Sequence, residues 1–205
     1  MKSKVFKNKK IVIASHNKGK IKEIRELLEL LDIDIFSSAD FDLQEPVEDG
    51  FSFEENALIK SSYASKMTGI PSLSDDSGIC FTDLNNEPGI YSARWAGENK
   101  DFDMAMCKIY NTLKKIKKPS YNCFFVCALS LSWPDGNNVT VSGKVDGKFS
   151  WPPKGKNGFG YDPIFRPLKY YKTFGEMEPK FKHLISHRAL AFKKLIKLCF
   201  PSLNR

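Results

Sequence analysis

The chain has 205 residues, of which 41% are hydrophobic and 27% are charged, so it can bury a core and is neither disordered nor fibrous in composition. Its net charge of +8 and pI near 9.1 favour an anionic partner such as a nucleotide or nucleic acid. No signal peptide precedes the first apolar run, and no stretch is long enough to cross a bilayer, so we expect a cytoplasmic protein without membrane contact.

The N-terminal third predicts alternating strands and helices. Residues 1–9 form a basic tail that we interpret as solvated, and residues 10–205 form a single two-lobed domain. Lys10–Ala14 predicts a buried strand, helically spaced apolar residues predict a helix over Lys18–Leu31, and Ile33–Phe36 predicts a second strand. This order is typical of an α/β fold.

The connection from Ser15 to Lys20 lies at the start of the first predicted helix. It places Asn17, Lys20 and several backbone N–H groups at the positive end of the helix dipole, where anions bind. It is not a Walker A loop, because the glycine spacing differs and Ile21 follows Lys20 where that motif has Ser or Thr. Taken alone, the segment favours a polar helix cap with two surface lysines.

An acidic loop, Asp40–Phe51, leads into a second predicted helix, Glu54–Met67, which Ser52 caps. This helix is largely apolar and carries Asn56 and Lys60 one turn apart on one face. Lys60 is either a solvated surface lysine or, given the apolar character of its helix, a lysine that points into a cleft.

The chain is organised around Ser74-Asp75-Asp76-Ser77-Gly78. These residues follow a turn and continue into Ile79–Phe81, so we predict a strand, in which consecutive side chains point to opposite faces. The two aspartates should therefore not be equivalent, and we place the chemistry on Asp76. On spacing alone, an Asp–Asp pair is more often a solvated turn or a helix cap.

The C-terminal part predicts a helix, a strand hairpin, a long glycine- and proline-rich loop and a final helix capped by Ser186. In chain order these elements span Asp101–Ile116, Tyr121–Trp133 with Asn138–Val145, Phe149–Tyr161, and Ala189–Phe200. The mixed pattern fits a two-lobed α/β domain with an antiparallel extension.

The five cysteines have irregular spacing and form no CxxC pair, which favours reduced intracellular thiols. Cys123 and Cys127 lie four residues apart in an apolar run, where a strand places both on its core-facing side. We prefer this interpretation to a metal site, because no histidine lies nearby.

A nucleoside triphosphate site needs donors for the phosphates, carboxylates that hold Mg²⁺, and a stacking surface with hydrogen-bonding groups for the base. The chain offers candidates for each: Asn17, Lys20 and Lys60 for phosphates, Glu48, Asp75 and Asp76 for the metal, and Phe159, Asp162, Lys182, His187 and Arg188 for the base. Each has a simpler explanation alone, since a phenylalanine is more often core and a His–Arg pair at a helix start is more often surface.

Six motifs occur in order along the chain: Ala14-Ser15-x-Asn17-x-Gly19-Lys20, Glu54-x-Asn56-Ala57 with Lys60, Ser74-Asp75-Asp76-Ser77-Gly78, Pro88-Gly89-Ile90-Tyr91-Ser92-Ala93-Arg94, Gly158-Phe159-Gly160-Tyr161-Asp162-Pro163-Ile164-Phe165 and Ser186-His187-Arg188. Together they resemble the inosine triphosphate pyrophosphatase (Ham1/RdgB-like) family, from residue 10 to about residue 197. Any one of these motifs is weak, but six in order are highly specific.

The resemblance implies an α/β fold in which an elongated mixed sheet with flanking helices forms two lobes around a central nucleotide-binding cleft, as in the Maf–Ham1 fold. It implies a homodimer with Pro88–Arg94 at or near the interface. It also implies Mg²⁺-dependent hydrolysis of ITP, dITP and XTP to the monophosphate and pyrophosphate, which keeps these noncanonical purines out of nucleic acid.

The resemblance also implies roles for individual residues. Asp76 would be the catalytic carboxylate, acting as a base toward water and touching Mg²⁺, with Glu48 and Asp75 supporting the metal or the water. The implied substrate contacts are Ser15, His16, Asn17, Lys18, Gly19, Lys20 and Lys60 for the triphosphate, Ser77 for the substrate, Phe159, Gly160, Tyr161 and Asp162 for the base, and Lys182, His187 and Arg188 for the base edge. His16 departs from the family, which commonly has a small residue there, and Lys182 lies in a loosely matching region.

The implied specificity has a physical basis. A 6-keto purine presents an acceptor where adenine presents an amino donor, so lysine and arginine donors favour the keto group. Two alternatives remain. A Maf-like pyrophosphatase acting on other modified nucleotides is disfavoured by the Phe-Gly-Tyr-Asp and Ser-His-Arg motifs. A basic nucleic-acid-binding module is disfavoured by the carboxylates, which repel phosphate, so we expect no stable nucleic-acid binding.

Overall fold

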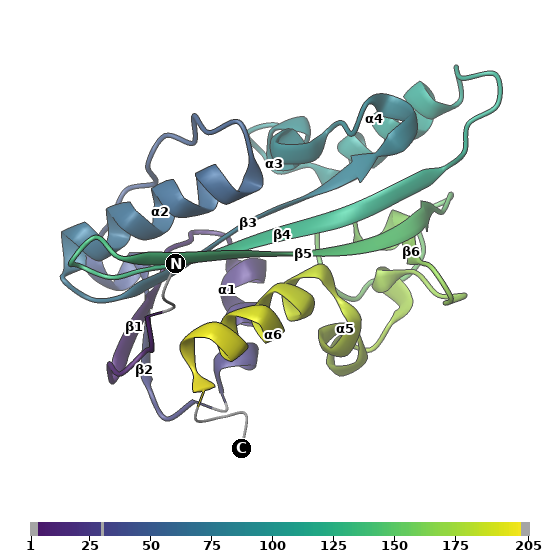
Figure 1. Cartoon of the computed structure of the whole chain (residues 1–205). Helices are drawn as coiled ribbons and strands as arrows, with labels where there is room; N and C mark the ends of the chain where they lie inside the picture. Colours follow the sequence, from purple (N-terminus) through teal and green to yellow (C-terminus); the bar gives the residue numbers. More distant parts are fainter. Residues whose placement is uncertain (1–3, 30, 202–205) are drawn as a thin grey trace. The chain divides into compact units, whose positions relative to one another are not determined.

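The computed structural model describes residues 4–29 and 31–201. They form a mixed α/β fold of two compact units (Figure 1). The described parts of residues 1–76, 127–143 and 188–205 make up the first unit, and residues 77–126 and 144–187 make up the second.

The sheet of the first unit has the strand order β2-β1-β3-β4-β5. β1 (Lys10–Ile13) pairs in parallel with β2 (Asp34–Ser37) on one side and with β3 (Ser72–Phe81) on the other. β4 (Asn122–Ser132) and β5 (Asn138–Phe149) continue the sheet. The apolar residues of β1 are fully buried, as expected for a parallel strand that is covered on both faces.

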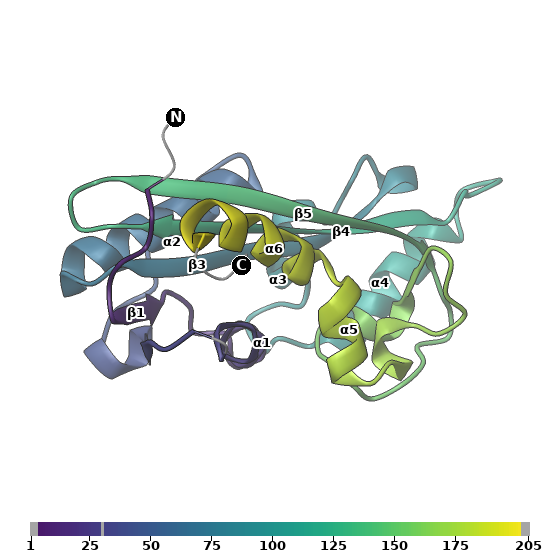
Figure 2. The same ribbon diagram turned by 60° about the horizontal axis from the view of Figure 1, so that its bottom comes forward.

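Helices cover both faces of this sheet (Figures 1 and 2). α1 (Lys18–Leu28) and α6 (His187–Cys199) lie on one face, and α2 (Phe53–Thr68) lies on the other. The apolar core of the unit is built mainly from branched aliphatic side chains. They include Ile11, Ile13, Ile24, Leu28, Leu73, Leu129, Leu131 and Leu195.

α2 meets the sheet partly through hydroxyl groups. Ser61 Oγ lies 3.0 Å from Ser130 Oγ and 2.8 Å from Ser132 Oγ, and Thr140 Oγ1 donates to Ser130 Oγ at 2.9 Å. Ser61 and Ser130 are fully buried, so each hydroxyl finds its partner inside the protein. The helix begins after Ser52, whose hydroxyl accepts a hydrogen bond from Glu55 N, and ends at Gly69.

The basic segment before β1 is not uniformly exposed. Phe6 is buried, its ring centroid lies 4.9 Å from that of Phe200, and its N–H donates to Cys199 O at 2.7 Å. Residues 1–3 lie outside the described residues. The part of the predicted tail that the structure describes is therefore attached to the first unit through the Phe6 side chain and main chain and through ion pairs of Lys4 with Asp135 and Lys9 with Asp32.

The second unit has the strand order β3-β4-β5-β6. β6 (Phe165–Pro167) is antiparallel to β5, with Lys148 opposite Arg166. The helices of this unit are α3 (Ser92–Trp95), α4 (Phe102–Leu113) and α5 (Pro179–Ile185). Its core is rich in aromatic side chains, and its fully buried members are Ile79, Phe81, Ala105, Ile109, Leu113, Ile164, Phe165 and Phe174.

The predicted mixed α/β class is confirmed, and the differences lie at element ends. The first helix ends at Leu28, earlier than predicted, and the second hairpin strand extends to Phe149. α5 was not predicted, because seven residues are too few to show a helical period. None of the described helices is long and apolar enough to span a membrane.

Candidate active site

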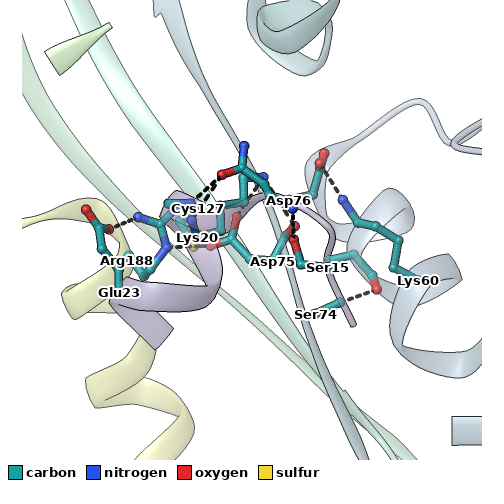
Figure 3. A network of polar contacts seen from close by, with 12 residues as sticks. Ser15, Lys20, Glu23, Lys60, Ser74, Asp75, Asp76, Cys127 and Arg188 are labelled. Carbon is teal, nitrogen blue, oxygen red and sulfur yellow. Dashed lines mark hydrogen bonds and ion pairs between the residues drawn. The ribbon is translucent and has the colours of Figure 1, made fainter. Parts of the chain in front are cut away.

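The two adjacent aspartates of β3 contact different helices (Figure 3). Asp75 Oδ1 lies 2.9 Å from Lys20 Nζ of α1, whereas Asp76 Oδ1 accepts a hydrogen bond from Lys60 Nζ of α2 at 2.9 Å. Because α1 and α2 cover opposite faces of the sheet, the two carboxylates point away from each other, as strand alternation requires. The prediction that they are not equivalent is confirmed.

The Asp75 carboxylate is enclosed by donors. Its Oδ2 accepts hydrogen bonds from Arg188 Nε at 2.7 Å and from Cys127 Sγ at 3.0 Å, and Lys20 Nζ also donates to the main-chain oxygen of Asp75 at 3.3 Å. Burial raises the pKa of Asp75, but Arg188 and Lys20 outweigh burial and hold the pKa well below its usual value. Asp75 is therefore ionised and serves as an anchor for Lys20.

Arg188 completes this network by pairing with Glu23 of α1 through Nη1. Its side chain is 1% exposed, and its Nε contacts Asp75. The family resemblance implied that Arg188 reads the edge of the base. In the structure, Arg188 contacts two carboxylates of the first unit, Asp75 and Glu23, and its contact with the base stays a prediction.

Asp76 has different surroundings. Lys60 Nζ lies 2.9 Å from Asp76 Oδ1 and 2.7 Å from Glu48 Oε1. Asp76 Oδ2 is buried and has no hydrogen-bond partner within residues 4–29 and 31–201. Burial raises the pKa of Asp76, and Lys60 and Lys20 offset only part of this effect. A carboxylate with a raised pKa and an available oxygen is suited to accept a proton.

The loop that carries Glu48 is fastened to the start of α2. Gly50 N donates to Asn56 Oδ1 at 2.9 Å, and Phe51 N donates to Glu55 Oε2 at 2.6 Å. A Cβ atom at Gly50 would lie 2.7 Å from Asn56 Oδ1, so glycine permits this close approach. Asn56 thereby holds the loop where Glu48 reaches Lys60.

Asn17 shapes the connection between β1 and α1. Its Oδ1 accepts hydrogen bonds from Gly19 N at 3.0 Å and Lys20 N at 3.1 Å, and Ser15 Oγ accepts one from Asn17 N at 3.2 Å. Two of the N–H groups expected to face an anion are thus bonded to Asn17. Lys18 is exposed, so Lys20 is the lysine of this segment that reaches the buried carboxylates.

His16 joins the same segment to the acidic loop. Its Nε2 lies 2.8 Å from Leu43 O, and its Nδ1 lies 3.6 Å from Glu45 Oε1. His16, Glu45, Lys60 and Tyr63 are among the residues that line a small hollow of the first unit. The residue that departs from the family pattern therefore links the phosphate segment to the loop with Glu48.

Of the three carboxylates that the resemblance implies for Mg²⁺, two have surroundings that fit a metal ion. Within the described ranges, no three His, Cys, Asp or Glu side chains gather closely enough to ligate one metal ion, and Asp75 is occupied by Lys20 and Arg188. Glu48 and Asp76 do fit, because they share Lys60 and Asp76 Oδ2 lacks a partner among the described residues. Mg²⁺ commonly binds one or two carboxylates together with substrate phosphates.

The second unit contains a separate cluster around Asp162. Its Oδ2 accepts hydrogen bonds from Phe159 N at 2.9 Å and from Lys182 Nζ at 2.6 Å, and Lys182 Nζ lies 5.2 Å from the centroid of the Phe159 ring. A Cβ atom at Gly158, whose φ is +74°, would lie 2.0 Å from Asp162 Oδ2, so this turn requires glycine. Three predicted base-binding residues are thus brought together.

The other predicted residues of this unit differ in burial. Tyr161 is 3% exposed and donates its hydroxyl to Ser92 O at 2.8 Å, so it packs in the core, and burial raises its pKa. His187 is buried, and its ring stacks on Phe125 with centroids 4.6 Å apart. Gly160 has a φ of +63°. Ser77 follows Asp76 directly and is half-buried.

Two residues of the first unit were missed in the sequence. Glu23 lies one helical turn after Lys20 and shares its face, so its spacing could have revealed it. Cys127 was predicted as a core thiol and is buried, but nothing local indicates its contact with Asp75, from which 52 positions separate it.

Comparison with known proteins identifies the family of this chain. Residues 11–198 match the model of the Ham1 family. A dITP/XTP pyrophosphatase of Zymomonas mobilis is 49% identical over 93% of this chain and 91% of its own length, and one of Rhizobium meliloti is 45% identical over 94% and 96%.

The solved structures that resemble this chain are also Ham1 proteins. A HAM1 protein from Coxiella burnetii has a TM-score of 0.84 at 36% identity, covering 92% of this chain and 96% of its own. The Staphylococcus aureus Ham1 protein has a TM-score of 0.83 at 38% identity, covering 96% and 100%. On the strength of its sequence and its fold, this chain belongs to the Ham1 family.

Proposed function

We propose that this protein hydrolyses the noncanonical purine nucleoside triphosphates ITP, dITP and XTP to the monophosphate and pyrophosphate, with Mg²⁺ as cofactor. The observation that carries the proposal is Asp76, a buried carboxylate with a raised pKa and an unpartnered oxygen in the described structure, beside Lys60 and Glu48. The relatives named dITP/XTP pyrophosphatase support the same activity.

The first unit supplies the groups for the triphosphate. Lys20 and Lys60 are cations that pair with the adjacent carboxylates of β3, and both would bind phosphate oxygens. Asn17 fixes the start of α1 and so sets the position of Lys20. These residues bind and orient the phosphates, which is the main requirement of phosphoryl chemistry.

Asp76 is the residue that moves the proton. Its carboxylate accepts a proton from a water whose oxygen bonds to the α-phosphorus, while the bond from this phosphorus to the oxygen that bridges to the β-phosphate breaks and pyrophosphate leaves. Glu48 and Asp76 would hold Mg²⁺, which supplies neutralisation of the phosphate charge when it is bound. In the protein without metal, burial raises the pKa of Asp76.

The second unit supplies the groups for the base. Phe159 offers an aromatic face, and Lys182 offers a cationic donor that Asp162 holds in place. A 6-keto oxygen satisfies such a donor, whereas the 6-amino group of adenine leaves it unpaired. Selection of deaminated purines follows from this difference.

A pyrophosphate-release assay tests the activity, with ITP, dITP, XTP, dATP and dGTP each measured with and without MgCl₂. We expect kcat/KM for the deaminated purines to exceed that for dATP and dGTP by about 10²-fold or more. Asp76→Asn should lower kcat by about 10²–10⁴-fold while the circular dichroism spectrum stays unchanged. Asp103→Asn, at an exposed position of α4, is the control. Equal rates on all five nucleotides contradict the proposal.

A homodimer is the second part of the proposal. Tyr91 is 45% exposed, and the Arg94 guanidinium carbon lies 5.0 Å from its ring centroid. Exposed tyrosine and arginine are enriched at protein interfaces, which supports the Pro88–Arg94 segment as part of the dimer contact. Light scattering should give twice the mass of 23.3 kDa, and Tyr91→Glu should shift the protein toward monomer. A monomeric wild type rejects this part.

A further inference from the structure

Lys60 occupies the position between two carboxylates. Its Nζ lies 2.7 Å from Glu48 Oε1 and 2.9 Å from Asp76 Oδ1, and its side chain is only 7% exposed. Burial lowers the pKa of Lys60, but Asp76 and Glu48 outweigh burial, so the lysine is charged. In the protein without metal or substrate, one ammonium therefore lies between two carboxylates.

Lys60 satisfies only part of the Asp76 carboxylate. It contacts Asp76 Oδ1, whereas Asp76 Oδ2 is buried and has no hydrogen-bond partner in the described part of the chain. A divalent cation would satisfy this arrangement better than one ammonium, and carboxylate oxygens are its preferred ligands. The lysine and the metal would approach the same two carboxylates.

Lys60 lies beside the segment that is proposed to bind the phosphates. It lines the small hollow that His16, Glu45 and Tyr63 help to form, and its side chain is a flexible four-carbon stem. His16 lies in the segment that precedes α1, where the proposed phosphate groups lie. Lys60 therefore needs only a change of side-chain conformation to exchange a carboxylate for a phosphate of a bound triphosphate.

We propose that Lys60 is a placeholder cation: it neutralises Glu48 and Asp76 in the metal-free protein, gives way when Mg²⁺ binds, and then pairs with a substrate phosphate. The inference rests on the proposed function for its Mg²⁺ and triphosphate. It predicts competition, because Lys60 weakens metal binding to the free enzyme while it strengthens triphosphate binding. If Lys60 instead only supports the two carboxylates, its loss weakens metal binding.

The experiment is a calorimetric titration of Mg²⁺ into nucleotide-free protein, for wild type, Lys60→Met and Lys60→Gln. Methionine keeps the length of the side chain in a buried position, and glutamine keeps a neutral donor. We expect the dissociation constant for Mg²⁺ to fall about tenfold in both variants, since a repelling charge at contact distance is removed. The KM for the triphosphate should rise in the same variants.

Lys66→Met is the matched control, because Lys66 is an exposed lysine of the same helix and its loss should leave the Mg²⁺ affinity unchanged. The increase in melting temperature on adding Mg²⁺ gives a second readout that needs no substrate. Unchanged or weaker Mg²⁺ binding in folded Lys60 variants, or no Mg²⁺ binding to any of the proteins, overturns the inference. Metal affinity is measured without nucleotide, so a failure of the proposed substrate specificity is seen separately in the pyrophosphate assay.

Discussion

Cys127 Sγ lies 3.0 Å from Asp75 Oδ2, on a neighbouring strand, and both side chains are buried. A thiol is a weak donor, and the strong partners of this carboxylate are Arg188 and Lys20. The contacts around Asp75 nevertheless act together, because removing one partner from a buried charged group leaves another group without compensation. The stability of this part of the protein is therefore tied to the same residues as its proposed chemistry.

Asp75→Asn should be strongly destabilising. It removes the buried carboxylate that Lys20 and Arg188 share, and breaking a buried ion pair in this way costs about 3–5 kcal/mol. Urea unfolding measures the change in the free energy of unfolding. Asp76→Asn is the comparison, since Lys60 keeps Glu48 as a partner, and its cost should be smaller. Equal costs for the two variants would contradict the different roles of the two aspartates.

The free energy of unfolding should fall at low pH because of Asp75. Its pKa in the folded protein lies well below the ordinary 3.8, so the unfolded chain binds the proton more readily. This contribution is complete above pH 3.8 and is lost as the pH falls through that value toward the folded pKa. Denaturant unfolding between about pH 5 and pH 2 should show a shallower decline for Asp75→Asn than for the wild type. Parallel declines would rule out this contribution from Asp75.

The contact of the Cys127 thiol with Asp75 can be tested with substitutions that keep or remove the hydrogen-bond donor. Cys127→Ser retains a hydrogen-bond donor, whereas Cys127→Val fills the space without one and leaves Asp75 with one partner fewer. We expect the valine variant to be less stable than the serine variant by about 1 kcal/mol, and its KM for the triphosphate to be higher because Asp75 holds Lys20. Cys123→Val, at a buried position of the second unit, is the control. A KM that is the same in Cys127→Ser and Cys127→Val removes Cys127 from substrate positioning.

Lys182→Met should reduce selectivity between purines. The variant loses the donor that Asp162 holds beside Phe159, so kcat/KM for dITP should fall more than kcat/KM for dATP. We expect the ratio of kcat/KM for dITP to that for dATP to fall by about tenfold or more. Lys180→Met, an exposed neighbour on α5, should leave the ratio unchanged. A preserved ratio in the Lys182 variant would assign the selection to other groups.

Local patterns predicted much of the fold and of the site. The helical spacing of α1 and the cap at Ser52 are local, and so is the alternation that separates Asp75 from Asp76. The sequence left two interpretations of Lys60, a solvated surface lysine or a lysine that points into a cleft. The structure shows its side chain buried between two carboxylates. That outcome depends on a loop folding back onto α2, which spacing within one helix does not encode.

Arg188 shows a contact that the sequence motif did not predict. Its motif implied contact with the base, and the structure adds contacts with Asp75 and Glu23, residues that are distant in the sequence and that spacing did not indicate. Long-range ion pairs of this kind depend on which helix packs on which face of the sheet. Sequence spacing gives the face of a single helix and does not give its partner.

The hydroxyl contacts under α2 have a consequence for how this helix responds to strain. Ser61, Ser130, Ser132 and Thr140 meet through groups that rotate freely and can both donate and accept. A small sliding of α2 therefore exchanges one hydroxyl partner for another instead of opening an apolar gap. α2, the helix that carries Lys60, therefore packs on the sheet through hydroxyl contacts that can exchange partners. On the opposite face, α1 and α6 pack mainly through close-packed apolar side chains.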